Sequence, residues 1–144
     1  MLATIGYISN AIELLKKGEI ESIVKNAITY NRAHGITGVL YSANGKFLQF
    51  IEGERIEIET LYEKILKDNR HSDVVIVYDA DIDKRSFGDW DMAIRHPEHY
   101  ESTEIELFDK IFNIYNIKFY KTAEQEQIKM QDLIDVFRKP VVRS

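Results

Sequence analysis

The sequence predicts an α+β fold, a ferredoxin-like βαββαββ sandwich with two helices on one face of the sheet and two appended C-terminal helices. Up to about residue 95, runs rich in β-branched and aromatic residues alternate with helical stripes of apolar residues in the order that this fold requires. After His96-Pro97 only helical stripes remain. We therefore expect a domain at 1–96 and a two-helix extension at 97–144 that packs on the same domain.

The first elements are a strand, a helix and a hairpin. Residues 2–9 make a short apolar run with β-branched and aromatic members, which is typical of a strand. Apolar residues at positions 20, 23, 24, 27 and 28 have the spacing of one helical face, and Gly35 is a natural residue to end that helix. Residues 36–42 and 46–51 then form a hairpin, because Asn44-Gly45 supplies the positive φ angles of a type I′ turn.

The later elements complete the order. Apolar residues at positions 58, 61, 62 and 65 predict a second helix that stops near Asp68. The continuous β-branched run at 74–78 predicts a buried strand, and another short strand is expected around 90–94. Two further stripes indicate the appended helices: Ile105, Phe108, Ile111, Phe112 and Tyr115, and then Met130, Leu133, Ile134 and Phe137.

Composition excludes several classes of function. The net charge is -5 and the charges are spread along the chain, so no basic face favours direct nucleic-acid binding. The absence of cysteine excludes disulfides, thiolate metal sites and cysteine nucleophiles. Neither a basic leader nor an apolar run long enough to span a bilayer occurs, so we expect a cytoplasmic protein without membrane association.

Two amide side chains stand where apolar ones are expected. Asn31 falls on the apolar face of the first helix, and strand alternation puts Gln49 on the same face as Phe47 and Ile51. An amide buried without partners costs roughly 1–3 kcal/mol on mutational scales. Asn31 could instead cap its own helix, and Gln49 could reach a backbone carbonyl or lie on a solvated face.

Taken together, two amides beside one sheet favour a planar heterocycle with alternating donors and acceptors, such as the edge of a flavin ring. Tyr7 alternates with Ile5 and Ala3 and is expected to share this face, although an ordinary core tyrosine would give the same pattern. Acidic residues at 79, 81 and 83 lack the glycine and glutamate of a calcium loop, and His96 and His99 have no further ligands nearby in sequence. We therefore predict no metal site.

A series of short motifs runs through the first 95 residues: Tyr7-Ile8-Ser9, Asn31 before Gly35-Ile36-Thr37-Gly38, Phe47-Leu48-Gln49 leading into Glu52-Gly53, Asp68 with Arg70-His71, and then Arg85, Phe87, Trp90 and Met92. The series closely resembles the BLUF family of blue-light sensors using FAD, over about residues 2–95 without large gaps. The resemblance implies a ferredoxin-like fold that binds FAD non-covalently between its two helices, with FMN or riboflavin as substitutes.

The resemblance also implies roles for individual residues. Tyr7 would be the photochemical electron and proton donor, Gln49 would bridge it to the N5 and O4 region of the flavin, and Asn31 would bind the O4 and N3 edge. Trp90 and Met92 would belong to the segment that rearranges after illumination. The remaining expected cofactor-binding residues are Ile23 and Ile65, which would flank the ring, and Tyr30, Lys64, Asp68 and His71.

In this hypothesis light moves an electron and a proton from Tyr7, and the Gln49 amide ends in a new orientation or tautomer. The flavin would return to its oxidised form with a slightly red-shifted spectrum. We then expect no enzymatic activity, a homo-oligomer that is a dimer or a ring assembly, and a separate downstream protein partner.

Two other functions stay open at this stage. One is a small flavin-dependent reductase, although the chain has no Gly-x-Gly-x-x-Gly motif, no phosphate loop and no Ser/His/Asp grouping. The other is a ligand-binding or oligomerisation module without photochemistry. A yellow protein with a reversible spectral shift under blue light would distinguish the sensor from both.

Overall fold

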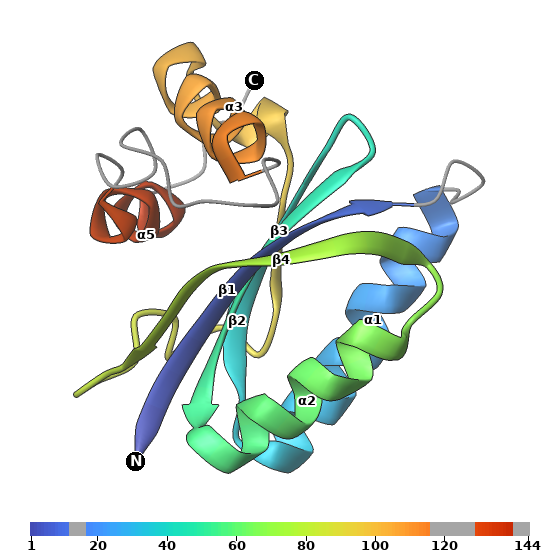
Figure 1. The fold of residues 1–144 in the computed structure, drawn as a ribbon, viewed down its shortest axis with the longest axis vertical. Helices are drawn as coiled ribbons and strands as arrows, with labels where there is room; N and C mark the ends of the chain where they lie inside the picture. The colour runs from blue at the N-terminus through green and yellow to red at the C-terminus, as the bar shows by residue number, and fades with distance from the viewer. Residues whose placement is uncertain (12–16, 116–128, 140–144) are drawn as a thin grey trace. The chain divides into compact units, whose positions relative to one another are not determined.

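The computed structural model describes residues 1–11, 17–115 and 129–139. The chain forms two compact units, Met1–Arg95 and His96–Ser144. The first unit is a five-stranded sheet with two helices lying side by side on one face, as Figure 1 shows. The predicted ferredoxin-like α+β fold is confirmed. The predicted packing of the second unit on the first stays a prediction.

The sheet has the strand order β4-β1-β3-β2-β5. Strand β1 (Leu2–Ala11) pairs antiparallel with both β3 (Lys46–Glu54) and β4 (His71–Asp81). Strand β2 (Thr37–Ala43) pairs antiparallel with β3 and parallel with the short β5 (Ala93–Arg95). The first four strands in this order make the ferredoxin-like sheet, and β5 is the added strand.

Glycine ends the first helix and closes the hairpin, as predicted. Helix α1 (Lys17–His34) stops before Gly35, whose φ is 64°, and the Ile36 N–H donates to the Asn31 backbone carbonyl at 2.9 Å. This bond closes the helix end in the manner of a Schellman motif. In the hairpin, φ is 52° at Asn44 and 74° at Gly45, which are the positive values of a type I′ turn.

The core of the first unit lies between the sheet and its two helices, α1 and α2 (Arg55–Lys67). Alternation along β1 and β3 points every second side chain toward the helices, and the helical stripes meet them. The same alternation carries Tyr7 and Gln49 to this face. The buried cluster consists of Ala3, Ile5, Val24, Ile36, Leu40, Phe47, Ile51, Ile58 and Met92.

Two strands differ from the sequence prediction. The run at 74–78 lies in β4, an edge strand in which Val77 is buried but Ile76 is 41% exposed, so the prediction of a buried strand is wrong. A β-branched run alone does not distinguish a central strand from an edge strand that pairs on one side. Strand β5 begins only at Ala93, so Trp90 and Met92 precede it.

The second unit contains the two predicted helices, α3 (Ser102–Tyr115) and α5 (Met130–Arg138), which confirms both stripes. Aromatic packing joins them: the Phe108 ring centroid lies 5.1 Å from that of Phe137 and 5.1 Å from that of Tyr100. Across the described residues, no helix combines the length and the apolar character needed to cross a membrane.

Candidate functional site

A cavity of about 230 Å³ opens between the sheet and the two helices of the first unit. A cavity that holds a single water molecule needs only about 10–15 Å³, so this one has room for a much larger group. Helix α1 contributes Ile23, Tyr30 and Asn31 to its walls, and α2 contributes Lys64 and Ile65. The lining also includes Tyr7 and Gln49 from the strands, and Asp68 and His71 after α2. The structure therefore brings together all nine residues predicted to bind a cofactor.

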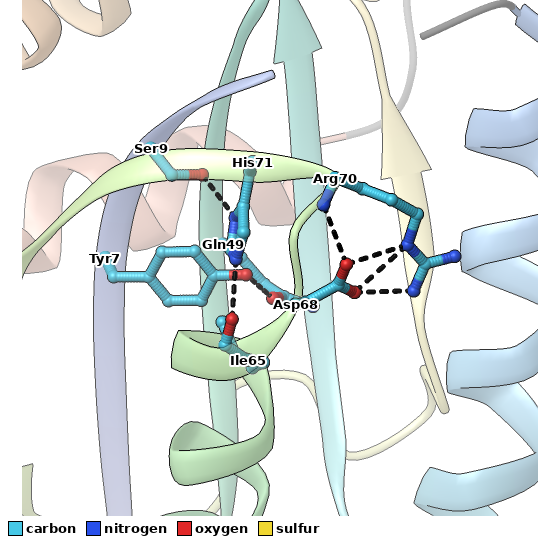
Figure 2. Close-up of polar contacts among 7 residues, drawn as sticks. All are labelled: Tyr7, Ser9, Gln49, Ile65, Asp68, Arg70 and His71. Atoms are coloured by element: carbon cyan, nitrogen blue, oxygen red, sulfur yellow. Dashed lines mark hydrogen bonds and ion pairs between the residues drawn. The ribbon is translucent and has the colours of Figure 1, made fainter. Parts of the chain in front are cut away.

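Tyr7 and Gln49 form a hydrogen-bonded pair at the base of this cavity. They are directly opposite each other in the antiparallel pairing of β1 with β3, and the Tyr7 hydroxyl donates to Oε1 of Gln49 (Figure 2). Tyr7 is 4% exposed and Gln49 is 7% exposed. Burial raises the pKa of Tyr7 far above its ordinary value, and the charges of Asp68 and Tyr62 add to the shift. Tyr7 therefore keeps its proton in the resting protein.

The other end of the Gln49 amide faces a much weaker partner. Its Nε2 donates to Sδ of Met92 at 3.5 Å, and a thioether sulfur is a weak acceptor. The alternative interpretations of Gln49, a bond to a backbone carbonyl or a solvated face, do not apply to this buried side chain. The present orientation of the amide is therefore set mainly by the Tyr7 hydroxyl, and its nitrogen side has only a weak acceptor.

Asn31 presents an oxygen that lacks a partner. Its Nδ2 donates to the Asp91 backbone carbonyl at 2.6 Å, and the side chain is only 1% exposed. Within the part of the chain that the structure describes, Oδ1 of Asn31 has no hydrogen-bond donor. The helix end is closed by the backbone carbonyl of Asn31, not by its side chain. A buried carbonyl oxygen without a donor is costly, so this atom marks a place for a ligand N–H group.

Tyr30 and Lys64 meet across the cavity from opposite helices. The Lys64 Nζ atom lies 4.4 Å from the centre of the Tyr30 ring, a distance at which a cation is attracted to the aromatic face. The Tyr30 ring also stacks on His34, with centroids 4.1 Å apart. Its hydroxyl is buried and has no partner among the described residues. These contacts bridge α1 and α2 beside the amide of Asn31.

Asp68 and Arg70 form a tight ion pair in the cavity wall (Figure 2). The Arg70 Nη2 atom lies 2.5 Å from Oδ2 of Asp68, and both Nε and the backbone N–H of Arg70 donate to the same carboxylate. The hydrogen bonds from Arg70 hold the pKa of Asp68 below its ordinary value. Arg70 lines the cavity as well and is not among the binding residues that the sequence predicts. Its place between Asp68 and His71 in the sequence motif is the feature that could have identified it as a residue of the site.

His71 is held by both of its ring nitrogens. Its Nε2 lies 2.7 Å from the Ile65 backbone carbonyl, which only accepts, so this nitrogen carries a proton. Nδ1 lies 2.9 Å from the Ser9 hydroxyl, which donates to it when the ring is neutral (Figure 2). The ring also meets Tyr7 edge to face, with centroids 6.1 Å apart. His71 therefore packs the Tyr7 ring and ties β4 to α2.

Of the two residues expected to respond to light, Met92 lines the cavity and Trp90 does not. Trp90 stacks on Phe87, with centroids 5.6 Å apart, and the Arg95 guanidinium lies 4.8 Å from the centre of its ring. The Gly38 N–H donates to the Trp90 carbonyl at 2.9 Å. The light-dependent role of both residues stays a prediction.

The two motifs weighed as metal sites have other partners. Arg55 donates to Asp79 at 2.7 Å and to Asp81 at 2.8 Å, which ties the end of β4 to the start of α2. His99 accepts a hydrogen bond through Nδ1 from the His96 backbone N–H at 2.9 Å, as part of a short turn.

Several apolar lining residues were also absent from the expected set. Val24 and Ala27 lie on the helical face that carries Ile23 and Asn31, and Leu40 stands opposite Gln49 in the pairing of β2 with β3. Helical spacing was sufficient to identify the first two. The position of Leu40 required the strand register, which sequence alternation does not define.

Comparison with known proteins gives a consistent result. The family described as "BLUF: Sensors of blue-light using FAD" matches residues 2–93. Photoactivated adenylate cyclase subunit alpha of Euglena gracilis is 40% identical over 87 residues, which are 60% of this chain and 8% of that protein. The beta subunit of Euglena longa is 37% identical over 93 residues, 64% of this chain and 11% of that protein. The chain thus spans about a tenth of the length of these relatives.

Solved structures resemble the chain in the same region and beyond it. The photo-activated state of BlsA has a TM-score of 0.76 at 25% identity and covers 100% of both chains. A bacterial light-regulated adenylyl cyclase has a TM-score of 0.69 at 32% identity, over 78% of this chain and 33% of that one. BlrP1 of Klebsiella pneumoniae, solved with FMN and cyclic diGMP, has a TM-score of 0.66 at 30% identity. The match covers 72% of this chain and 28% of the BlrP1 chain.

Proposed function

Because the chain belongs to the BLUF family, the sensors of blue light using FAD, we propose that light moves an electron and a proton from Tyr7 and leaves Gln49 rearranged. Members of this family bind flavin and act as sensors, and this chain is a blue-light sensor of that kind. The observation that carries the residue-level proposal is the position of the Gln49 amide between the Tyr7 hydroxyl and the Met92 sulfur.

The lining of the cavity suits the chemistry of a flavin. Ile23 and Ile65 supply apolar walls from the two helices, which suits the faces of a planar ring. The unpaired Oδ1 of Asn31 is an acceptor for the ring imide N–H. Lys64, Tyr30, Asp68 and His71 complete the binding set that we propose. FMN is a plausible substitute for FAD on the same donor set, since BlrP1 was solved with FMN.

The protein's part in the light reaction follows from the pair of Tyr7 and Gln49. A flavin that absorbs blue light supplies a strong one-electron oxidant. Tyr7 gives up one electron, and its hydroxyl proton moves along the existing hydrogen bond to Oε1 of Gln49. Proton loss makes the electron transfer favourable, because a buried phenol radical cannot keep a positive charge at low cost. The electron then returns to Tyr7 together with one proton. If Oε1 gives back the proton it received, the amide is restored and is left rotated; if the rotated amide gives one from Nε2 and Oε1 keeps its own, the imidic acid tautomer is left.

A changed amide alters its neighbours on both sides. If the amide turns, its nitrogen no longer donates to Sδ of Met92, and its N–H groups face other acceptors. A stronger hydrogen bond to the ring would shift the absorption to longer wavelength while the flavin stays oxidised. The loss of the sulfur contact carries the change to the residues just before β5. This is a two-state polar network that light biases.

The remaining parts of the proposal concern the protein as a whole. We propose that the chain is not itself an enzyme, that it is cytoplasmic and that it forms a homo-oligomer. We also propose that it acts through a separate protein, since family members pass their signal to downstream effectors. Light scattering in darkness and under blue light tests the oligomer, and a monomer in both conditions would contradict it.

The flavin-loaded chain should be yellow and should show a reversible red shift of its flavin absorption under blue light. Absorption spectra taken before illumination, during it and through recovery in darkness test this directly. A bound flavin whose spectrum does not change would contradict the proposed light reaction and would favour a ligand-binding module.

A further inference from the structure

Two tyrosines of the described residues, Tyr7 and Tyr30, line the cavity, and they differ in where a proton could go. The Tyr7 hydroxyl donates to Oε1 of Gln49, so a proton that leaves it has an acceptor. The Tyr30 hydroxyl is also buried, but it has no hydrogen-bond partner within the described part of the chain. A phenol that loses an electron and cannot pass on its proton keeps a positive charge in a poorly solvated place, which is costly. One cavity thus holds two phenols, and the structure gives only Tyr7 a path for its proton among the described residues.

Lys64 places a positive charge beside the second phenol. Its Nζ atom lies 4.4 Å from the centre of the Tyr30 ring, and the electron-rich face of the intact ring attracts a cation at this distance. Removal of an electron from the ring would turn this attraction into repulsion between two positive charges. Lys64 therefore makes Tyr30 a poorer electron donor than the same phenol would be without it.

His34 also lies against the Tyr30 ring, and it has a carboxylate partner of its own. The two rings stack with centroids 4.1 Å apart and an angle of 21° between their planes. Nδ1 of His34 lies 2.8 Å from Oε2 of Glu57. Neither His34 nor Glu57 accepts a hydrogen bond from the Tyr30 hydroxyl, which has no partner among the described residues. The surroundings of Tyr30 thus combine a nearby cation with the lack of a proton acceptor.

We propose that Lys64 is a specificity-determining residue, whose ammonium group suppresses oxidation of Tyr30 and so leaves Tyr7 as the donor. The inference rests on the proposed function, because it concerns the choice of donor in that reaction. In the suppressed side reaction, Tyr30 gives one electron to the light-excited flavin and keeps its hydroxyl proton. Return of the same electron restores Tyr30, and no proton moves at Gln49. The absorbed light is then lost without a red shift.

The test uses the variant Tyr7→Phe, which removes the proposed donor and leaves both Tyr30 and Lys64 in place. The measurement is the fluorescence lifetime of FAD bound to the protein, because an electron donor in contact with the excited ring shortens it. Adding Lys64→Gln removes the charge and keeps a polar side chain. We expect it to shorten the lifetime roughly threefold, on the scale of a lost cation–π contact. Adding Tyr30→Phe as well should restore the long lifetime, because the effect requires the phenol.

Lys67→Gln is the matched control, because Lys67 is an exposed lysine of the same helix that does not line the cavity. Added to Tyr7→Phe, it should leave the lifetime unchanged. Lys64→Arg retains the positive charge and should retain the long lifetime. Electron paramagnetic resonance of samples frozen under blue light gives a second readout. A signal of oxidised tyrosine should appear with Lys64→Gln and disappear when Tyr30→Phe is added.

Three outcomes would overturn the role of Lys64. One is an unchanged lifetime with Lys64→Gln, and another is a longer one, because the ammonium group would then act on the flavin and not on Tyr30. The third is a shortening that persists after Tyr30→Phe is added.

If Lys64→Gln does not bind FAD, the decision passes to Tyr7→Phe with Lys64 in place. A lifetime that lengthens by roughly threefold or more when Tyr30→Phe is added would show that Tyr30 donates beside the cation, which overturns the inference. A smaller change supports it. The proposed function fails separately, if the protein with Tyr7 intact binds FAD and shows no red shift, because the lifetimes above are measured without Tyr7.

Discussion

The Tyr7 hydroxyl meets the Gln49 side-chain oxygen across two neighbouring strands, at positions that face each other directly in the antiparallel pairing. The backbone ladder therefore sets the distance between donor and acceptor, and no loop movement is needed to bring them together. The amide nitrogen of Gln49 is left with the sulfur of Met92. The Tyr7 donor is thus fixed by the strand pairing, and the amide beside it has only a weak acceptor for its nitrogen.

The substitution Gln49→Leu should abolish the red shift and destabilise the flavin-free protein. Among the residues that the structure describes, it removes the one hydrogen bond of the buried Tyr7 hydroxyl, and an unsatisfied buried polar group costs about 1–3 kcal/mol. Absorption spectroscopy tests the first effect and urea unfolding the second. A red shift of wild-type size in this variant would show that the amide is not part of the light reaction.

The substitution Met92→Leu keeps the volume of the side chain but removes the sulfur acceptor. The dark orientation of Gln49 then loses a weak bond at the low end of the usual 0.5–1.5 kcal/mol, so dark recovery should slow by roughly two- to fivefold. The decay of the red-shifted absorption in darkness measures this rate. Met130→Leu, in helix α5 of the second unit, is the matched control, and slowing of the same size there would argue against a specific contact.

The substitution Asn31→Ala should weaken flavin binding. The buried Oδ1 is the proposed acceptor for the ring imide, and leaving that donor unpaired costs about 1–3 kcal/mol, or roughly 5- to 150-fold in the dissociation constant. Quenching of flavin fluorescence on titration with flavin-free protein measures the affinity. Asn113→Ala, at an exposed position in α3, should bind like the wild type. Equal affinities in Asn31→Ala and wild type would remove Asn31 from the site.

Asp68 should make the stability of the first unit depend on pH on the acid side. Hydrogen bonds from Arg70 lower the pKa of Asp68 in the folded protein, so its stabilising contribution is present above the ordinary value of 3.8. The contribution is lost as the pH falls through the lower, folded value. Because the carboxylate is only partly buried, solvent screening keeps the effect small.

Urea unfolding of the wild type and of Asp68→Asn at several pH values tests this. The wild type should be more stable near neutral pH, and the difference between the two proteins should shrink as the pH falls below about 4. A difference that stays constant with pH would show that the ion pair with Arg70 does not contribute.

Much of the site could be predicted from the sequence because its residues break a regular pattern. Asn31 interrupts a helical stripe and Gln49 interrupts a strand alternation, so the face of each followed from periodicity alone. The register between strands did not, because alternation is unchanged when two strands slide by two residues. The direct pairing of Tyr7 with Gln49 therefore emerged only from the structure.

The segment before β5 shows a second limit. Alternation through 90–94 would place Trp90 and Met92 on one face, yet the strand begins at Ala93 and the Trp90 N–H bonds back to Phe87 in a turn. The anchors that set this path, Glu52 and Gly38, are distant in sequence and carry no local signal. For the same reason the edge position of β4 was not apparent from its β-branched run.

The central claim is that Tyr7 is the light-driven donor, and the comparison of Tyr7→Phe with Tyr62→Phe tests it most directly. The Tyr62 ring lies 6.1 Å from that of Tyr7, but Tyr62 does not line the cavity. Difference absorption spectra under blue light should show a reversible red shift in the wild type and in Tyr62→Phe, and none in Tyr7→Phe with its flavin still bound. A red shift of undiminished size in Tyr7→Phe would contradict the account.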